Sequence, residues 1–143
     1  MPAARAETDF PGTHAGFAAG FDWLRERLDA QELGAAPRYN VELVFEEIVS
    51  NIVSYGAVRG RELRIRVTLE SAAATIVLIF EDNGIAFDPC QRTTAPPHAR
   101  SLEEAQLGGF GLILVRHAAR SFTYERTSAG CNRVTVTLQR AAG

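Results

Sequence analysis

LRIRVTLESAAATIVLIF, residues 63–80, is the stretch that decides the fold. Every second residue from Leu63 to Leu69 is apolar and the residues between them are polar, which predicts a strand with one buried and one solvent-facing side. Residues 75–80 are continuously apolar and rich in β-branched side chains, as in a central strand. Residues 71–74 can form the turn between them. The stretch therefore predicts a β-hairpin inside a sheet.

Helical periodicity lies on both sides of this hairpin. Apolar residues recur at helical spacing between Phe17 and Leu28, Asn40 is a suitable N-cap for a second helix, and Gly56 is a suitable end for it. The expected elements are helices over residues 13–30, 40–55 and 112–119 and strands over residues 63–69, 75–80, 122–125 and 134–138, with weak strand character at residues 5–10.

This order separates helices from strands, so we expect one α+β domain over residues 1–143. Its architecture is predicted to be a two-layer α/β sandwich, with a mixed or antiparallel sheet and helices packed on one face. Strands and helices alternate too little for a doubly wound sheet. Residues 89–107 interrupt the pattern with three prolines and are expected to form a long loop, of the kind often used as an active-site lid.

Composition excludes several kinds of function. All 15 basic residues are Arg, and without Lys the chain cannot build a P-loop nucleotide site, a eukaryotic-type protein kinase site or a Schiff-base enzyme. A net charge of −2 disfavours direct binding to nucleic acid or to an anionic membrane. No apolar run approaches the roughly 18 residues of a membrane span, so a cytoplasmic protein is expected.

The first candidate site lies on the second helix. Glu47 and Asn51 are one turn apart, about 40° around the helix, along one edge of its apolar face. A carboxylate and a carboxamide placed in this way can act as a general base and as a metal ligand over one bound phosphate. The alternative is an ordinary solvated pair on the shoulder of a helix.

Two further candidates follow along the chain. Asp82 comes directly after the central strand, where it can accept a hydrogen bond from an exocyclic amine, and Gly84 lets the backbone pass close to a ring; the alternative is a hairpin turn at Asn83-Gly84. The third candidate comprises Gly108, Gly109 and Gly111, which open a helix whose N-terminal N–H groups can bind phosphate without lysine; the alternative is a flexible hinge.

The order of these motifs resembles the N, G1 and G2 boxes of the GHKL (histidine-kinase-like) ATPase superfamily. The similar stretches are EEIVSNIVSYG (46–56), EDNGIAFDP (81–89), GGFGLILVR (108–116) and GCNRVTVTL (130–138). Within the superfamily, the chain is most similar to the single-domain bacterial anti-sigma-factor serine/threonine kinases. The resemblance implies the superfamily's Bergerat-type sandwich, with ATP and Mg²⁺ as cofactors.

The resemblance also implies roles for single residues. Glu47 would be the catalytic base, and Asn51 would bind the nucleotide through Mg²⁺. The remaining nucleotide-binding positions would be Asp82 and Gly84 at the adenine, Gly108, Gly109 and Gly111 around the phosphates, and Thr135 as support for the adenine pocket.

For function, the resemblance implies an ATP-binding anti-sigma regulatory protein that phosphorylates a serine or threonine of a STAS-type antagonist. Its partners would be a sigma factor and that antagonist, and a homodimer is possible. Relatives often have a basic residue in the lid, where this chain has Ala105 and Gln106. The alternative is therefore a nucleotide-switched binding module with little or no phosphoryl transfer.

Overall fold

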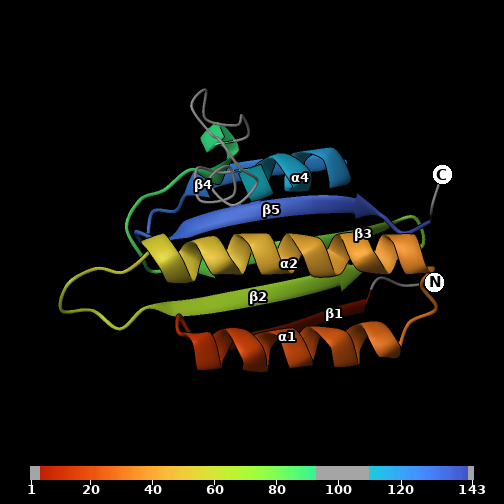
Figure 1. Cartoon of the computed structure of the whole chain (residues 1–143), viewed down its shortest axis with the longest axis horizontal. Coiled ribbons are helices and arrows are strands. Elements are labelled where there is room, and N and C mark those ends of the chain that lie inside the picture. Colours follow the sequence, from red (N-terminus) through yellow and green to blue (C-terminus); the bar gives the residue numbers. More distant parts are fainter. Residues whose placement is uncertain (1–3, 93–109, 142–143) are drawn as a thin grey trace.

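The computed structural model describes residues 4–92 and 110–141. In these ranges the chain forms five strands, three α-helices and one 3₁₀ helix (Figure 1). In chain order they are β1 (Ala4–Pro11), α1 (His14–Asp29), α2 (Ala35–Tyr55), β2 (Arg64–Ser71), β3 (Thr75–Asp82), η1 (Pro89–Arg92), α4 (Phe110–Ala118), β4 (Ser121–Arg126) and β5 (Asn132–Gln139).

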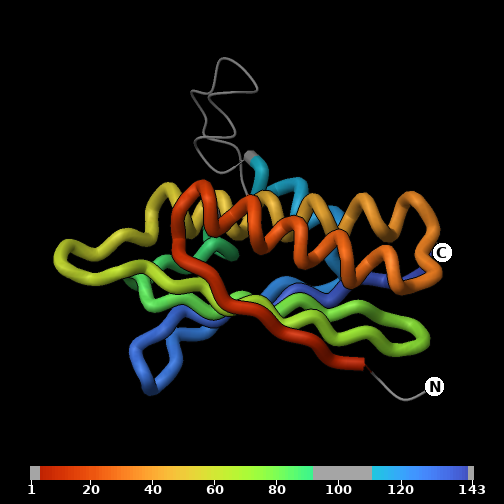
Figure 2. Tube along the Cα trace, turned by 90° about the horizontal axis from the view of Figure 1, so that it is seen from below, coloured from red at the N-terminus to blue at the C-terminus, as the bar shows by residue number. Residues whose placement is uncertain are grey.

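The strands form a single sheet in the order β1-β2-β3-β5-β4, and each neighbouring pair is antiparallel. Helices α1, α2 and α4 all lie on one side of this sheet, so the described chain has two layers (Figure 2). The predicted α+β sandwich is confirmed, and of the two sheet types expected, the antiparallel one is present. None of the described helices combines the length and the apolarity that crossing a bilayer requires.

The core lies between the layers and is centred on Phe45 of α2, which is completely buried. Its ring packs at centroid distances of 5.7–6.2 Å against four other aromatic rings, which are those of Phe10, Phe17, Phe21 and Phe80. These rings come from β1, α1 and β3. One side chain of α2 therefore joins both helices of the N-terminal half to the sheet, which fixes the position of α2 over the central strands.

The start of α2 and the extent of β1 differ most from the sequence prediction. Helix α2 begins at Ala35, five residues before the expected cap at Asn40, with Gly34 as its N-cap. Pro37 lies in the first turn of the helix, where a missing N–H removes no helical hydrogen bond, so this proline is compatible with the helix. The weak pattern at residues 5–10 is a full strand, because β1 pairs with β2 along its whole length.

The predicted lid is only partly described. Its first residues, Pro89–Arg92, form the 3₁₀ helix η1 rather than an irregular loop. The rest of the lid lies outside the described residues, as do Gly108 and Gly109.

We expect Phe45→Ala to lower the free energy of unfolding by about 3–5 kcal/mol, the usual cost of removing a buried phenyl ring and leaving a cavity. Urea denaturation followed by circular dichroism measures this. Tyr39→Ala is the matched control, because Tyr39 lies on the same helix and is 64% exposed; its effect should stay within about 0.5 kcal/mol. Equal losses in the two variants would contradict the position assigned to the core.

Candidate nucleotide site

One face of α2 carries the first part of the site. Glu47, Asn51 and Tyr55 follow one another at intervals of four residues, so they form a stripe beside the buried stripe that contains Phe45. The packing of the core therefore determines where this stripe points. As the sequence predicted, Glu47 and Asn51 lie on the same edge of the helix.

The nitrogen of the Asn51 carboxamide is engaged in a hydrogen bond, and no described residue donates a hydrogen bond to its oxygen. Its Nδ2 donates a hydrogen bond of 2.6 Å to the backbone carbonyl of Glu47, within the same helix. This bond orients the side chain, because an amide whose nitrogen faces the Glu47 carbonyl must direct its oxygen away from that carbonyl. Asn51 lines the pocket described below, and its Oδ1 is an oxygen ligand of the type that Mg²⁺ prefers.

Asp82 forms the second part of the site, at the end of β3. Its side chain is 5% exposed, and its Oδ1 accepts hydrogen bonds from the Gly84 N–H (2.9 Å) and from Nδ2 of Asn132 (3.0 Å). No described residue donates a hydrogen bond to Oδ2. One oxygen of the carboxylate is thus held by the protein, and the other is an acceptor that remains for a ligand donor such as an exocyclic amine.

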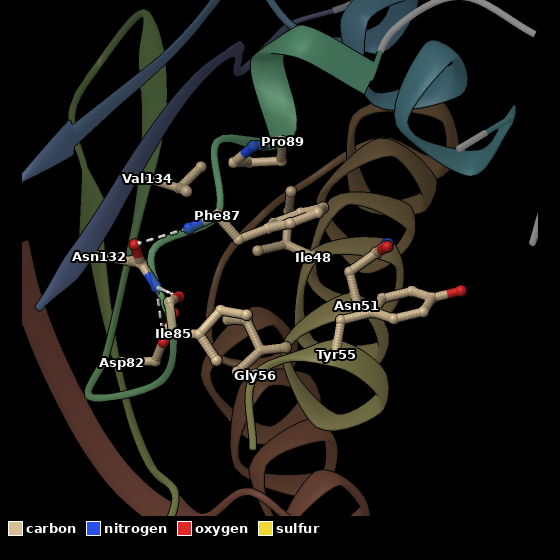
Figure 3. Close-up of a pocket in the computed structure, with 11 residues that line it drawn as sticks. Ile48, Asn51, Tyr55, Gly56, Asp82, Ile85, Phe87, Pro89, Asn132 and Val134 are labelled. Carbon is tan, nitrogen blue, oxygen red and sulfur yellow. Dashed lines mark hydrogen bonds between the residues drawn. The ribbon is translucent and has the colours of Figure 1, made fainter. Parts of the chain in front are cut away.

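A pocket joins Asp82 to α2 (Figure 3). Asn51 and Tyr55 line it from α2, Asp82 from β3 and Asn132 from β5. The other lining residues are mostly apolar: Ile48, Ile52, Gly56, Ile85, Phe87, Pro89 and Val134. A pocket with apolar walls and a few fixed polar groups is typical of sites for flat organic ligands. The rings of Tyr55 and Phe87 stack at its wall, with their centroids 6.3 Å apart.

Gly84 is required by close packing between the loop after β3 and the end of α2. The Ile85 N–H donates to the Gly56 carbonyl at 3.0 Å, and a Cβ on Gly84 would collide with that same carbonyl. From the sequence, Gly84 is predicted to make room for a ring. In the structure, the space that it provides is filled by the α2 terminus.

The third part of the site is the contact between Glu47 and α4. Gly111 lies in the first turn of α4, and a Cβ there would overlap the Glu47 carboxylate. The half-buried position of this carboxylate raises its pKa, mainly through desolvation and to a lesser extent through the neighbouring charge of Glu46. A raised pKa brings a carboxylate closer to the range in which a general base works best.

Asp82 has a raised pKa for a similar reason. Burial is the largest cause, and the hydrogen bonds from Asn132 and Gly84 and the charge of Arg126 partly oppose it. Perturbed carboxylates in a pocket are characteristic of functional sites, because the fold places a charged group where desolvation makes it costly. Asp82 meets this description in the pocket, whereas the perturbed carboxylate of Glu47 lies at the contact with α4 and does not line the pocket.

The structure brings Glu47, Asn51, Asp82, Gly84 and Gly111 to one side of α2, although they are far apart in the sequence. It does not bring Thr135 to the pocket. Buried residues alternate along β5, so Asn132 and Val134 face the helices, whereas Thr135 is on the opposite face of the sheet. Gly108 and Gly109 are not among the described residues.

Sequence reasoning missed Asn132, the residue of β5 that takes the place expected for Thr135. Asn132 is 4% exposed and pairs directly with Asp82 in the sheet register. A signal was available, because the alternation of Val134, Val136 and Leu138 places Asn132 on the buried face. A buried carboxamide at the end of a strand requires polar partners, which indicates a site.

Arg116 is not placed to neutralise phosphate charge at the start of α4. Its guanidinium lies 5.0 Å from the centroid of the Phe122 ring, in the last turn of α4. The phosphate-binding end of a helix is its first turn, so Arg116 is at the wrong end for that role.

The chain combines a two-layer sandwich with a pocket lined by an amide and a buried Asp, and it belongs to the histidine kinase-like ATPase domain family, whose model matches residues 10–138. The chain is 37% identical over 119 residues to the serine/threonine-protein kinase BtrW of Bordetella bronchiseptica, covering 83% of this chain and 82% of that protein. The predicted family is thereby confirmed.

The fold is also found in a solved structure, that of the RsbU and RsbW domains of Rv1364c from Mycobacterium tuberculosis. The TM-score is 0.62 at 16% identity, and the match covers 99% of this chain and 34% of that one. This chain therefore spans about a third of that longer chain, and the likeness establishes the shared fold.

We expect Asp82→Asn to raise the melting temperature of the ligand-free protein at pH 7. The folded pKa of Asp82 is raised, so its charge destabilises the folded state above that pKa, and the penalty disappears as the pH falls and the carboxylate is protonated. The gain should therefore shrink in acid. Thermal unfolding followed by circular dichroism between pH 4 and pH 7 measures it.

The exposed Asp22 of α1 provides the control, since Asp22→Asn removes the same charge without relieving desolvation and should leave the melting temperature nearly unchanged. A melting temperature of Asp82→Asn at or below that of the wild type at pH 7 would contradict the assignment of Asp82 as a destabilising buried charge.

Proposed function

We propose that this protein is an ATP-dependent serine/threonine protein kinase of the anti-sigma type. The observation that carries the proposal is the convergence of Glu47, Asn51 and Asp82 on one side of α2, with one oxygen of Asp82 to which no described residue donates a hydrogen bond. The similarity to a serine/threonine-protein kinase supports the choice of reaction.

The residues present fit a magnesium–adenine nucleotide. Oδ2 of Asp82 would accept the adenine amine, Oδ1 of Asn51 would hold Mg²⁺, and the first turn of α4 would face the phosphates. When bound, Mg-ATP supplies the phosphoryl group with its negative charge partly neutralised. These interactions would need no lysine, because phosphoryl transfer depends on positioning and charge stabilisation.

Glu47 would accept the proton of the attacking serine or threonine hydroxyl. Its carboxylate lies between α2 and the start of α4, and its pKa is raised by desolvation. A base of this kind removes the proton as the oxygen attacks phosphorus, and the contribution is typically 10²–10⁴-fold.

The proposed partners are a sigma factor and a STAS-type antagonist that carries the phosphorylated residue. Both partners follow from the resemblance to anti-sigma kinases. On this proposal the protein itself would stay in the cytoplasm, regulate transcription and form a homodimer. The second candidate is a nucleotide-switched binding module, which Ala105 and Gln106 in the lid favour because neither can neutralise phosphate charge.

Glu47→Gln separates these two functions. We expect this variant to bind Mg-ATP with nearly wild-type affinity, while transfer of ³²P from labelled ATP to a STAS-domain partner falls about 10²–10⁴-fold. Exposed Glu46 is the matched control, and Glu46→Gln should retain most of the transfer. If the wild type binds Mg-ATP but labels no STAS-domain partner, the kinase is excluded and the switch module is supported.

We expect Gly111→Ala to lower transfer at least tenfold without destabilising the fold. Alanine favours a helix over glycine by about 1 kcal/mol, but the new Cβ would displace the Glu47 carboxylate. Gly34→Ala is the control, since a Cβ there meets only Pro37 at 3.6 Å. Steady-state transfer rates and melting temperatures of both variants provide the test, and wild-type transfer by Gly111→Ala would contradict the proposed place of Glu47.

A further inference from the structure

Arg126 joins three segments around the pocket, although it lies on the edge strand of the sheet. It is the last residue of β4, directly opposite Asn132 in the pairing of β4 with β5. Its Nη1 donates to the Gly84 carbonyl and to Oδ1 of Asn132, both at 3.1 Å. One guanidinium nitrogen therefore bridges the loop after β3 and the start of β5.

Both acceptors of Arg126 are also partners of Asp82. The Gly84 N–H and Asn132 Nδ2 each donate to Oδ1 of Asp82, so Arg126 holds the two residues that hold the carboxylate. Tyr124 reinforces Asn132 from the same strand, because its hydroxyl donates to Asn132 Oδ1 at 2.6 Å.

The bonds made by Asn132 leave it a single orientation. Its Nδ2 donates to Asp82 and to the Ile85 carbonyl (2.7 Å), and its Oδ1 accepts from the Phe87 N–H (3.3 Å) (Figure 3). The same Oδ1 also accepts from Tyr124 and Arg126. A flip of the amide would bring oxygen against two acceptors and nitrogen against three donors. The two donors from β4 thus act together with the Phe87 N–H and the Ile85 carbonyl to direct Nδ2 of Asn132 toward Asp82.

The surroundings of Asp82 make the charge of Arg126 important. In the described part of the chain, Tyr55 faces the pocket from α2, Ile65 pairs with Asp82 from β2, and Tyr124 and Arg126 approach from β4. Of these, Arg126 carries the positive charge that lowers the pKa of Asp82 against the effect of burial.

We propose that Arg126 is a positioning residue of the nucleotide pocket, which acts through Gly84 and Asn132 to keep the Asp82 carboxylate in place as the acceptor for adenine. The adenine part of this inference rests on the function proposed above. The support of Asp82 by Arg126 is a property of the ligand-free protein and can be tested on its own.

The test uses Arg126→Gln and Arg126→Lys, with Arg133→Gln as the matched control. Arg133 lies on the opposite face of the same strand pair, where it forms ion pairs with Glu81 and Glu125. All measurements use low ionic strength, because Arg126 is exposed and its field is screened by salt. The two readouts are ¹³C NMR titration of the Asp82 carboxyl in the free protein and calorimetric affinity for Mg-ADP from pH 5 to pH 8.

We expect Arg126→Gln to raise the pKa of Asp82 and to weaken Mg-ADP binding about threefold to tenfold at pH 7. Binding needs the ionised carboxylate, so the loss of affinity on acidification should begin at a higher pH than in the wild type. Comparison at each pH removes the titration of the nucleotide itself, which is common to all variants. Arg126→Lys keeps the charge and should restore the titration of Asp82, and Arg133→Gln should match the wild type in both readouts.

The inference is overturned if Asp82 titrates in Arg126→Gln as in the wild type, or if Arg133→Gln shifts it equally, which would indicate a general charge effect. Failure of the wild type to bind Mg-ADP would instead refute the proposed function. In that case the NMR titration still decides whether Arg126 supports Asp82.

Discussion

The burial of one carboxylate, that of Asp82, is the constraint on which the site depends. A charged group that is 5% exposed is costly unless its hydrogen bonds are satisfied. One oxygen accepts hydrogen bonds from Gly84 and Asn132, and no described residue donates a hydrogen bond to the other. Much of the local structure follows from this need, including the tight loop after β3 and the polar end of β5.

The same helix that organises the core also presents the site. Phe45 anchors α2 to the sheet and to α1. The stripe of the same helix that lies beside Phe45 carries Glu47, Asn51 and Tyr55. Because a helix turns by a fixed angle per residue, the orientation that buries Phe45 also sets the direction of Glu47 and Asn51. Stability and function are therefore linked through the geometry of one rigid element, which is a suitable support for positioned polar groups.

Close backbone approaches complete the arrangement. Gly84 lets the loop after β3 meet the end of α2, and Gly111 lets the Glu47 carboxylate meet the start of α4. At each place the absence of a side chain allows polar atoms to approach one another. The chain contains no lysine, so under the proposed function these contacts and the helix termini would stabilise the phosphate charge in place of a lysine.

The sequence by itself determined the elements and their faces. Period-two alternation in residues 63–69 and helical periodicity around Phe45 were sufficient to predict the sandwich, and the order of three motifs was sufficient to predict the family. These patterns are local, and they report which side of each element is buried. The early start of α2 and the full length of β1 were not predicted, because the first has no side-chain cap and the second depends on pairing with β2.

Only the tertiary structure decided which residues meet. The register of β3 against β5 places Asn132, and not Thr135, beside Asp82, since neighbours along a strand point to opposite faces of the sheet. The approach of Arg126 to Gly84 joins residues 42 positions apart. Contacts of this kind depend on how separate elements are packed against one another, and the periodicity within each element carries no information about that.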